Sequence, residues 1–245
     1  VSNYVCLASA QHSVLRRAGW DLTASGLRGA PAVRLVVGGD RHGSIDRAAR
    51  FCGIGSSELV VARSDDDGRM TVAGLTSALA ESDGPAIVCL QAGEVHTGAF
   101  DPFDELIPIA RDHGAWVHVD GAFGLWAAAS PRLEHLTAGV GAADSWTTDA
   151  HKTLNVPYDS GMAIVRDPAD AIAMFRTGGD YLMFASLDPW DVAPELSRRA
   201  RGVPAWAALR SLGSAGVAEL VDRLHRNALR LADGLGGIRG VSVVN

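Results

Sequence analysis

Short apolar runs rich in β-forming residues alternate along this chain with segments of helical spacing, and no other feature constrains the fold as strongly. The apolar runs lie at residues 33–37, 59–62, 86–90, 115–119, 145–148 and 162–165. Helical spacing begins near Ile45, Val72, Pro102 and Ala169, and capping residues such as Ser44, Thr71 and Asp101 precede it. Alternation with short connections is typical of an α/β fold, in which a mostly parallel sheet has helices on both faces.

Both ends of the chain predict that it is part of a longer protein. The first residues already have helical spacing, from Val1 to about Ala18, with no cap or preceding turn. The C-terminal part is helical again at residues 205–212 and 217–235, and a strand-like run at 241–245 follows. Since no internal repeat or linker interrupts the pattern, we expect one domain that forms a segment of a larger chain.

The composition excludes several classes of protein. With 245 residues, of which 47% are hydrophobic and 20% charged, the chain can bury a sizeable core and does not resemble a disordered one. No apolar stretch approaches the roughly 18 residues of a membrane span, and no signal peptide is visible, so we expect a cytoplasmic protein. A net charge of -6 without runs of Lys or Arg predicts no binding of nucleic acid. Cys6, Cys52 and Cys89 are far apart and odd in number, which favours reduced, buried thiols.

Polar residues follow four of the predicted strands, at the point where each strand ends. They lie at residues 40–42, 93–97, 120 and 149–152. Ligands of open α/β sheets bind outside the carboxyl ends of the strands, so we expect these four loops to converge on one crevice.

Lys152 is the residue most worth following, because it is the only lysine among the 22 basic residues. Only lysine can lose its proton near neutral pH and act as a nucleophilic amine or form a Schiff base. The alternative is a solvated surface lysine, which is the common state of this residue type. Its place after an apolar strand and beside His151 favours imine chemistry on a carbonyl cofactor.

Asp120 and His42 are the other two candidates for chemistry. Asp120 ends an apolar strand and precedes Gly121 and Ala122, so it is either a turn cap or a carboxylate that pairs with a cation such as a pyridinium nitrogen. His42 stands between a strand and a helix, as a cap or surface residue or as an imidazole stacked on a planar ring and able to move a proton.

Other motifs carry little weight. The glycines of residues 234–240 follow a helix and do not open one, unlike a dinucleotide site. His113 and His135 have no partners at metal-ligand spacing, so we predict no metal site, and no Gly-x-Ser-x-Gly motif favours a serine hydrolase.

Together, these stretches resemble the group II amino acid decarboxylases, which depend on pyridoxal 5'-phosphate (PLP) and include the aromatic-amino-acid and glutamate decarboxylases. The matching segments are HVDGAFG at 118–124, ADS at 143–145, DAHK at 149–152, NVPYDSG at 155–161, the segment around His42, and 194–201 leading into Trp206. The resemblance implies an α/β fold of the aspartate-aminotransferase type (PLP fold type I). Residues 1–235 would be the PLP-binding large domain, and residues 236–245 would begin a C-terminal small domain.

The resemblance also implies roles for individual residues. Lys152 would form the Schiff base, Asp120 would pair with the pyridine nitrogen, and Ala122 would pack against one face of the ring. His42 would stack on the other face, and His151 would lie near the phosphate or the substrate. The family's active sites lie at a subunit interface, which implies a homodimer.

Three departures from the family pattern stand out. The glycine- and serine-rich phosphate loop expected just before Val1 is absent, and residues 93–97 read GEVHT where many relatives have Gly-Thr-Thr. The segment 183–193 lacks the tyrosine that often protonates the carbanion, with only Trp190 and Asp191 near its place, and Tyr181 comes too early.

We therefore expect a carboxy-lyase that decarboxylates an L-amino acid through a Lys152 aldimine and releases carbon dioxide and an amine. The missing tyrosine leaves open an aldehyde synthase, an oxidative deaminase or another lyase on the same cofactor. A second alternative is a non-catalytic scaffold domain. The substrate amino acid does not follow from the sequence.

Overall fold

The computed structural model describes residues 1–81, 83–176 and 188–243. Six strands form one sheet in the order β2-β1-β3-β4-β5-β6, and only β6 runs antiparallel to its neighbour. The strands are β1 Arg34–Val37, β2 Leu59–Val61, β3 Ala86–Gln91, β4 Trp116–Asp120, β5 Ser145–Asp149 and β6 Gly161–Val165. All six predicted strands are confirmed, because buried parallel strands are nearly continuous apolar runs.

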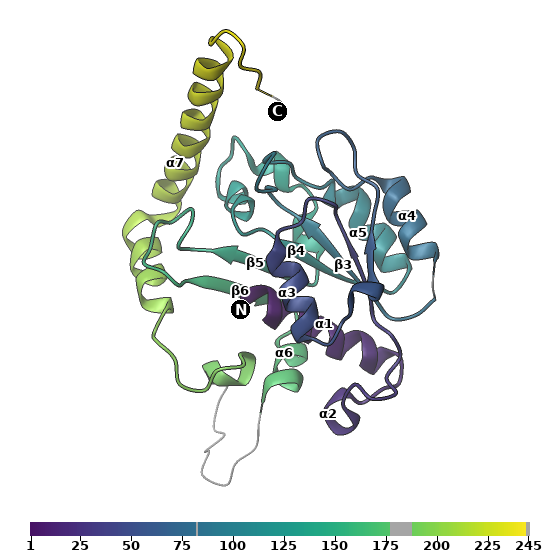
Figure 1. The fold of residues 1–245 in the computed structure, drawn as a ribbon. Helices are drawn as coiled ribbons and strands as arrows, with labels where there is room; N and C mark the ends of the chain where they lie inside the picture. The colour runs from purple at the N-terminus through teal and green to yellow at the C-terminus, as the bar shows by residue number, and fades with distance from the viewer. Residues whose placement is uncertain (82, 177–187, 244–245) are drawn as a thin grey trace.

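The helices also follow the predicted order (Figure 1). The α-helices are α1 Ser2–Arg17, α2 Leu22–Ser25, α3 Gly43–Phe51, α4 Val72–Ala80, α5 Phe103–Asp112, α6 Pro168–Phe175 and α7 Gly202–Gly236. Short 3-10 helices lie at η1 Ser56–Glu58, η2 Gly124–Ala129, η3 Glu134–Thr137, η4 Val140–Ala142 and η5 Pro189–Val192. The two predicted C-terminal helices are the two parts of α7, which breaks at Gly213 where φ is 63°.

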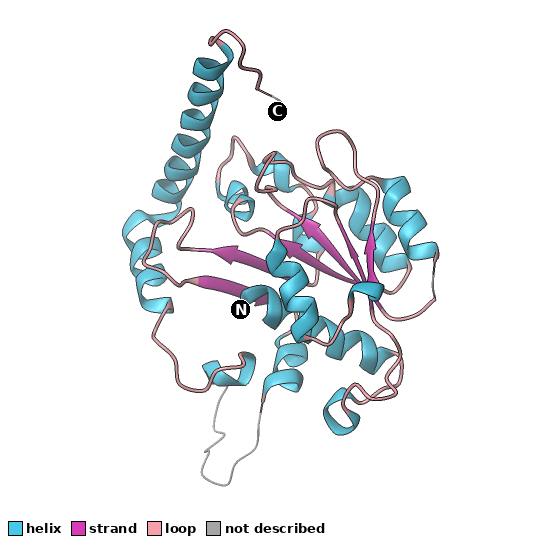
Figure 2. Cartoon of the chain, in the orientation of Figure 1, coloured by secondary structure: helices cyan, strands magenta, loops and turns pink. Residues whose placement is uncertain are grey.

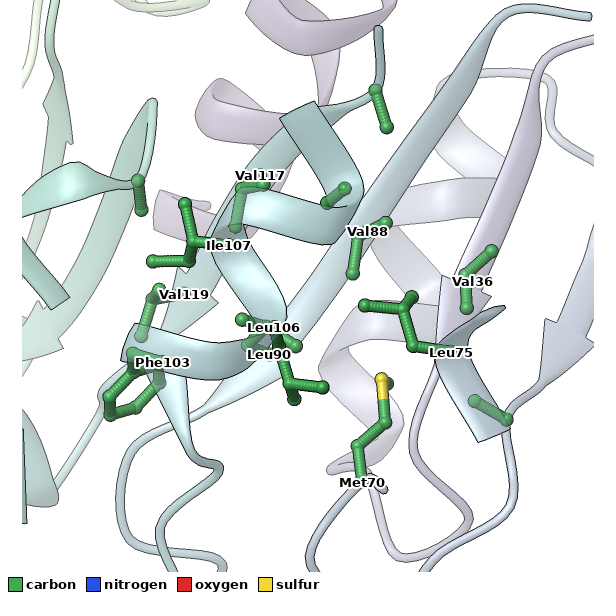
Figure 3. Close-up of a cluster of buried hydrophobic side chains, with 14 of the residues drawn as sticks. Val36, Met70, Leu75, Val88, Leu90, Phe103, Leu106, Ile107, Val117 and Val119 are labelled. Carbon is green, nitrogen blue, oxygen red and sulfur yellow. The ribbon is translucent and has the colours of Figure 1, made fainter. Parts of the chain in front are cut away.

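Helices cover both faces of the sheet, as predicted (Figure 2). On one face, α4 and α5 pack on β1, β3 and β4 through a cluster that includes Leu75, Leu106 and Phe103 (Figure 3). On the other face, α1 and α3 pack through a cluster that includes Leu15 and Ile45. Burying each such side chain stabilises the fold by about 1.5–3 kcal/mol, so the central strands form a rigid platform for the residues at their ends.

Some expectations about single residues are wrong. His42, not Ser44, caps α3, and Pro102, not Asp101, precedes α5 as its cap residue. Asp101 is instead buried, where it accepts 2.7 Å hydrogen bonds from the backbone N–H groups of Met70 and Gln91. Burial raises the pKa of Asp101 to about 6. Residues 241–243 carry no strand, and the rest of that predicted run lies outside the described residues.

The three cysteines are buried and unpaired, as predicted. Burial raises the pKa of Cys6 and of Cys52 to about 12, which makes both thiols poor nucleophiles. In the part of the chain that the structure describes, no helix combines the length and the apolar character that a membrane span requires.

Candidate active site

Asp120 ends β4 beside Thr147 of the neighbouring strand β5, with which it pairs in register. Asp120 is 8% exposed, and its carboxylate accepts hydrogen bonds from the backbone N–H of Ala122 at 3.2 Å and from the Asn3 side-chain amide at 3.1 Å. The Thr147 hydroxyl oxygen lies 3.3 Å from the same carboxylate, but it is closer to Asn3 Oδ1, at 2.9 Å, and donates its single proton there. These hydrogen bonds hold the Asp120 carboxylate in one place at the carboxyl edge of the sheet.

Lys152 lies in the loop that follows β5, three residues beyond Asp149. The Lys152 Nζ atom is 3.0 Å from Asp149 Oδ2 and 4.2 Å from the centre of the Phe123 ring. Its side chain is 24% exposed. The carboxylate and the ring face both attract a cation, so the amine is held at one position between the two loops and is not a freely solvated lysine.

His151 is fixed by its own loop. Its Nδ1 atom accepts a 3.1 Å hydrogen bond from the backbone N–H of Ser160, and its ring lies 4.3 Å from that of Tyr158. Since Nδ1 is an acceptor, the proton of the neutral ring is on Nε2, 3.8 Å from Asp149 Oδ2. Asp149 therefore lies between the polar ends of His151 and Lys152.

His42 caps the N-terminus of α3 with its ring. Its Nδ1 atom is 3.3 Å from the backbone nitrogen of Ser44 and 2.8 Å from the Ser44 hydroxyl oxygen. The cap requires extended backbone at His42, which has φ of −66° and ψ of 138°. The ring itself is exposed at the end of β1, where a flat ligand can reach it.

The turn after β4 is built from small residues. A Cβ on Gly121 would lie 2.7 Å from the Leu125 side chain, and a Cβ on Gly124 would overlap the carbonyl of Ala92. The half-buried Ala122 between them accepts a 3.1 Å hydrogen bond from the backbone N–H of Asp149. The turn thereby ties the end of β4 to the end of β5.

These contacts join the five predicted site residues, and we call the set the site network. Side-chain contacts lead from His42 to Ser44 (2.8 Å), from Ser44 to Asn3 (3.0 Å) and from Asn3 to Asp120 (3.1 Å). The backbone N–H of Ala122 then contacts Asp120 (3.2 Å), and the backbone N–H of Asp149 contacts Ala122 (3.1 Å). The Asp149 carboxylate lies 3.0 Å from Lys152 Nζ and 3.8 Å from His151 Nε2. The structure thus brings together side chains that are more than a hundred positions apart in sequence.

Sequence reasoning missed three members of the site network. Asn3, Ser44 and Asp149 were assigned no role in the chemistry, although Asp149 belongs to the DAHK motif and Ser44 was expected as a cap. The position of Asp149 beside the sole lysine is a signal that could have found it. Nothing local singles out Asn3, because its contacts depend on how α1 packs across β4 and β5.

Other sequence candidates make their hydrogen bonds and ion pairs outside the site network. Glu94 closes its own turn, accepting 2.8 Å hydrogen bonds from the backbone N–H groups of His96 and Thr97. Asp191 lies in η5, where Arg176 contacts its carboxylate at 2.8 Å. Tyr181 and residues 183–187 of the segment that lacks the expected tyrosine lie outside the described residues.

Comparisons with known proteins show which family this chain resembles. Residues 2–238 match the family described as the pyridoxal-dependent decarboxylase conserved domain. Acidic amino acid decarboxylase GADL1 of the mouse (Mus musculus) is 30% identical over 224 residues, which cover 87% of this chain and 41% of that protein.

Two solved structures have a fold similar to that of this chain. The crystal structure of mouse CSAD in apo form has a TM-score of 0.88 and 27% identity, and the match covers 98% of this chain and 51% of that one. The crystal structure of Oryza sativa TDC with PLP and tryptamine has a TM-score of 0.86 and 26% identity, with coverage of 96% and 50%. The chain therefore spans about half the length of the relatives it matches.

Proposed function

We propose that this chain, which belongs to the pyridoxal-dependent decarboxylase family, forms the cofactor-binding part of an enzyme that decarboxylates an L-amino acid and releases carbon dioxide and an amine. The observation that carries the proposal is the site network, which connects the sole lysine to a buried carboxylate and to a histidine at a strand end. A scaffold domain has no need of this set.

The residues of the site network suit PLP in their chemistry. Lys152 offers the primary amine that attaches the cofactor, and Asp120 offers an anion to the pyridine nitrogen. Ala122 would pack on one face of the ring and His42 on the other, with His151 near the phosphate or the substrate. When bound, PLP supplies an electron sink for the bond that breaks at the α-carbon of the substrate.

The chain's own residues do the positioning. Asp149 orients the Lys152 amine, and the ring of Phe123 shields one side of that amine from water. The hydrogen bonds from Asn3 and Ala122 hold the Asp120 carboxylate where it would pair with the pyridine nitrogen. The exposed ring of His42 offers its Nε2–H group as a donor to the substrate.

Borohydride reduction of the protein loaded with PLP, followed by peptide mass mapping, tests the proposal. Because Lys152 is the only lysine of these 245 residues, a phosphopyridoxyl mass on its peptide identifies the cofactor and its anchor together. Lys152→Arg is the matched control, since it keeps a cation beside Asp149 but cannot form an imine. A folded protein without this label would refute the proposal and favour the scaffold alternative.

The reaction products separate decarboxylation from the alternative chemistry on the same cofactor. A decarboxylase releases an amine, whereas an aldehyde synthase or oxidative deaminase releases an aldehyde, ammonia and peroxide. We propose the amine, and assays for all four products against a panel of L-amino acids test this and identify the substrate.

We further propose a homodimer, as the family resemblance implies, with residues 1–235 in the large domain and 236–245 at the start of a small domain. Light scattering of the purified protein measures the number of subunits, and a monomer that is fully active would refute the dimer. The cytoplasmic location stays a prediction.

A further inference from the structure

A second set of buried polar side chains lies beneath the site network. Trp116 and His118 precede Asp120 on the same face of β4, and Ser145 lies beside them on β5. Their hydrogen bonds connect Trp116 to Ser145 at 2.9 Å, Ser145 to His118 at 3.0 Å and His118 to Asn3 at 3.0 Å. Asn3 is thus the point where this buried set joins the site network.

The direction of each hydrogen bond follows from the chemistry of the donors. The indole nitrogen of Trp116 can only donate, so Ser145 Oγ accepts from it and donates its single proton to His118 Nδ1. His118 then carries its own proton on Nε2 and donates it to Asn3 Oδ1. His118 is neutral, because burial lowers its pKa to about 4.

The Asn3 amide has one possible orientation in these surroundings. The Asp120 carboxylate accepts but cannot donate, so the amide nitrogen of Asn3 faces it at 3.1 Å and uses its second proton on Ser44 Oγ at 3.0 Å. The amide oxygen accepts hydrogen bonds from His118 Nε2 and from the Thr147 hydroxyl, which is 2.9 Å away. Every donor and acceptor of the Asn3 side chain is therefore used.

The hydrogen bond between Ser44 and His42 can be assigned in the same way. Ser44 Oγ accepts from Asn3 and lies 2.8 Å from His42 Nδ1, to which the Ser44 hydroxyl proton can be donated. The backbone N–H of Ser44 also points to Nδ1, at 3.3 Å. Nδ1 of His42 is therefore an acceptor, and the proton of its neutral ring is on Nε2.

We propose that Asn3 is a positioning residue that fixes Asp120 as an acceptor and, through Ser44, sets His42 in the tautomer with its proton on Nε2. The inference rests on the proposed function, because Asn3 matters for turnover only if Asp120 and His42 contact the cofactor. It also predicts which ring nitrogen of His42 carries the proton, and this can be measured without any turnover.

The variant Asn3→Asp tests this with almost no change of shape. Two buried carboxylates 3.1 Å apart cannot both be charged, so the introduced acid would share one proton with Asp120 and offer Ser44 an oxygen in place of an N–H donor. The Ser44 hydroxyl would turn toward that oxygen and leave its own oxygen for His42. His42 Nδ1 would then keep only the longer 3.3 Å contact to the Ser44 backbone N–H, so the tautomer protonated on Nδ1 should become populated. Long-range proton–nitrogen spectra of the holoenzyme labelled with ¹⁵N-histidine report which ring nitrogen carries the proton.

Gln11→Leu is the matched control, since Gln11 is a buried amide on the same helix and donates to the backbone oxygen of Cys52, away from the site network. We expect Asn3→Asp to move the His42 Nδ1 signal toward the protonated range and to lower kcat/KM about 10- to 100-fold, the usual loss when an outer-shell partner is removed. Gln11→Leu should leave both unchanged.

If His42 Nδ1 stays unprotonated in Asn3→Asp, or if Gln11→Leu changes the spectrum equally, the inference is wrong. Should Asn3→Asp fail to fold, Ser44→Ala gives the second measurement, because it removes the hydroxyl and should allow His42 to populate both tautomers. The borohydride label on Lys152 is scored separately in the unsubstituted protein. A missing label with the expected His42 spectra would refute the proposed function and leave the hydrogen-bond direction standing.

Discussion

His118 should make the stability of the fold depend on pH. Burial lowers its pKa from 6.5 to about 4, against the opposing charge of Asp120. Between these values the unfolded chain binds a proton that the folded chain does not, so the stability present above the unfolded pKa is lost as the pH falls. Linkage between these two pKa values gives a loss of about 2 kcal/mol between about pH 7 and about pH 5.

Urea unfolding of the protein and of His118→Gln, both without added cofactor, measures the contribution of His118 to the free energy of unfolding. Other groups titrate in the same range, including His12, whose pKa burial also lowers, but their contributions cancel in the difference between the two proteins. At about pH 7 the unsubstituted protein should be the more stable, and its advantage should shrink by about 2 kcal/mol at about pH 5. An advantage that is the same at both values would mean that His118 is not held neutral by burial.

Three further substitutions test the site and its support. Asp120→Ala should keep the borohydride label on Lys152 but slow decarboxylation on the order of 100-fold, because the ring nitrogen loses its anion; near-normal turnover would contradict that role. Asp191→Asn should lower the melting temperature by breaking its ion pair with Arg176, the residue that follows α6, and leave the Lys152 label intact, whereas loss of the label would place Asp191 in the site. Gly124→Ala should lower the free energy of unfolding, measured in urea, by about 1–3 kcal/mol, because the added Cβ overlaps the backbone of Ala92. An unchanged free energy of unfolding would show that the turn can move to make room for the Cβ.

The order of strands and helices was readable from the sequence, because each central strand is buried on both faces and needs a continuous apolar run. The residues at the strand ends were readable for a related reason. A lone lysine and an aspartate directly after such runs have few structural uses, so Lys152 and Asp120 stood out, and the motif around them indicated the family. Caps were harder, since Ser44 and His42 are both able to cap α3 and only the backbone geometry decides between them.

The sequence by itself therefore determined the class of fold and the family, and it supplied the candidate groups for the chemistry. Tertiary structure alone decided what holds those groups. Asn3 contacts Asp120, which is 117 positions away, and His118, because α1 packs across β4 and β5. Hydrogen bonds need partners within about 3 Å and at a suitable angle. No local pattern encodes which side chains meet that condition, since packing of the whole sheet and its helices brings them together.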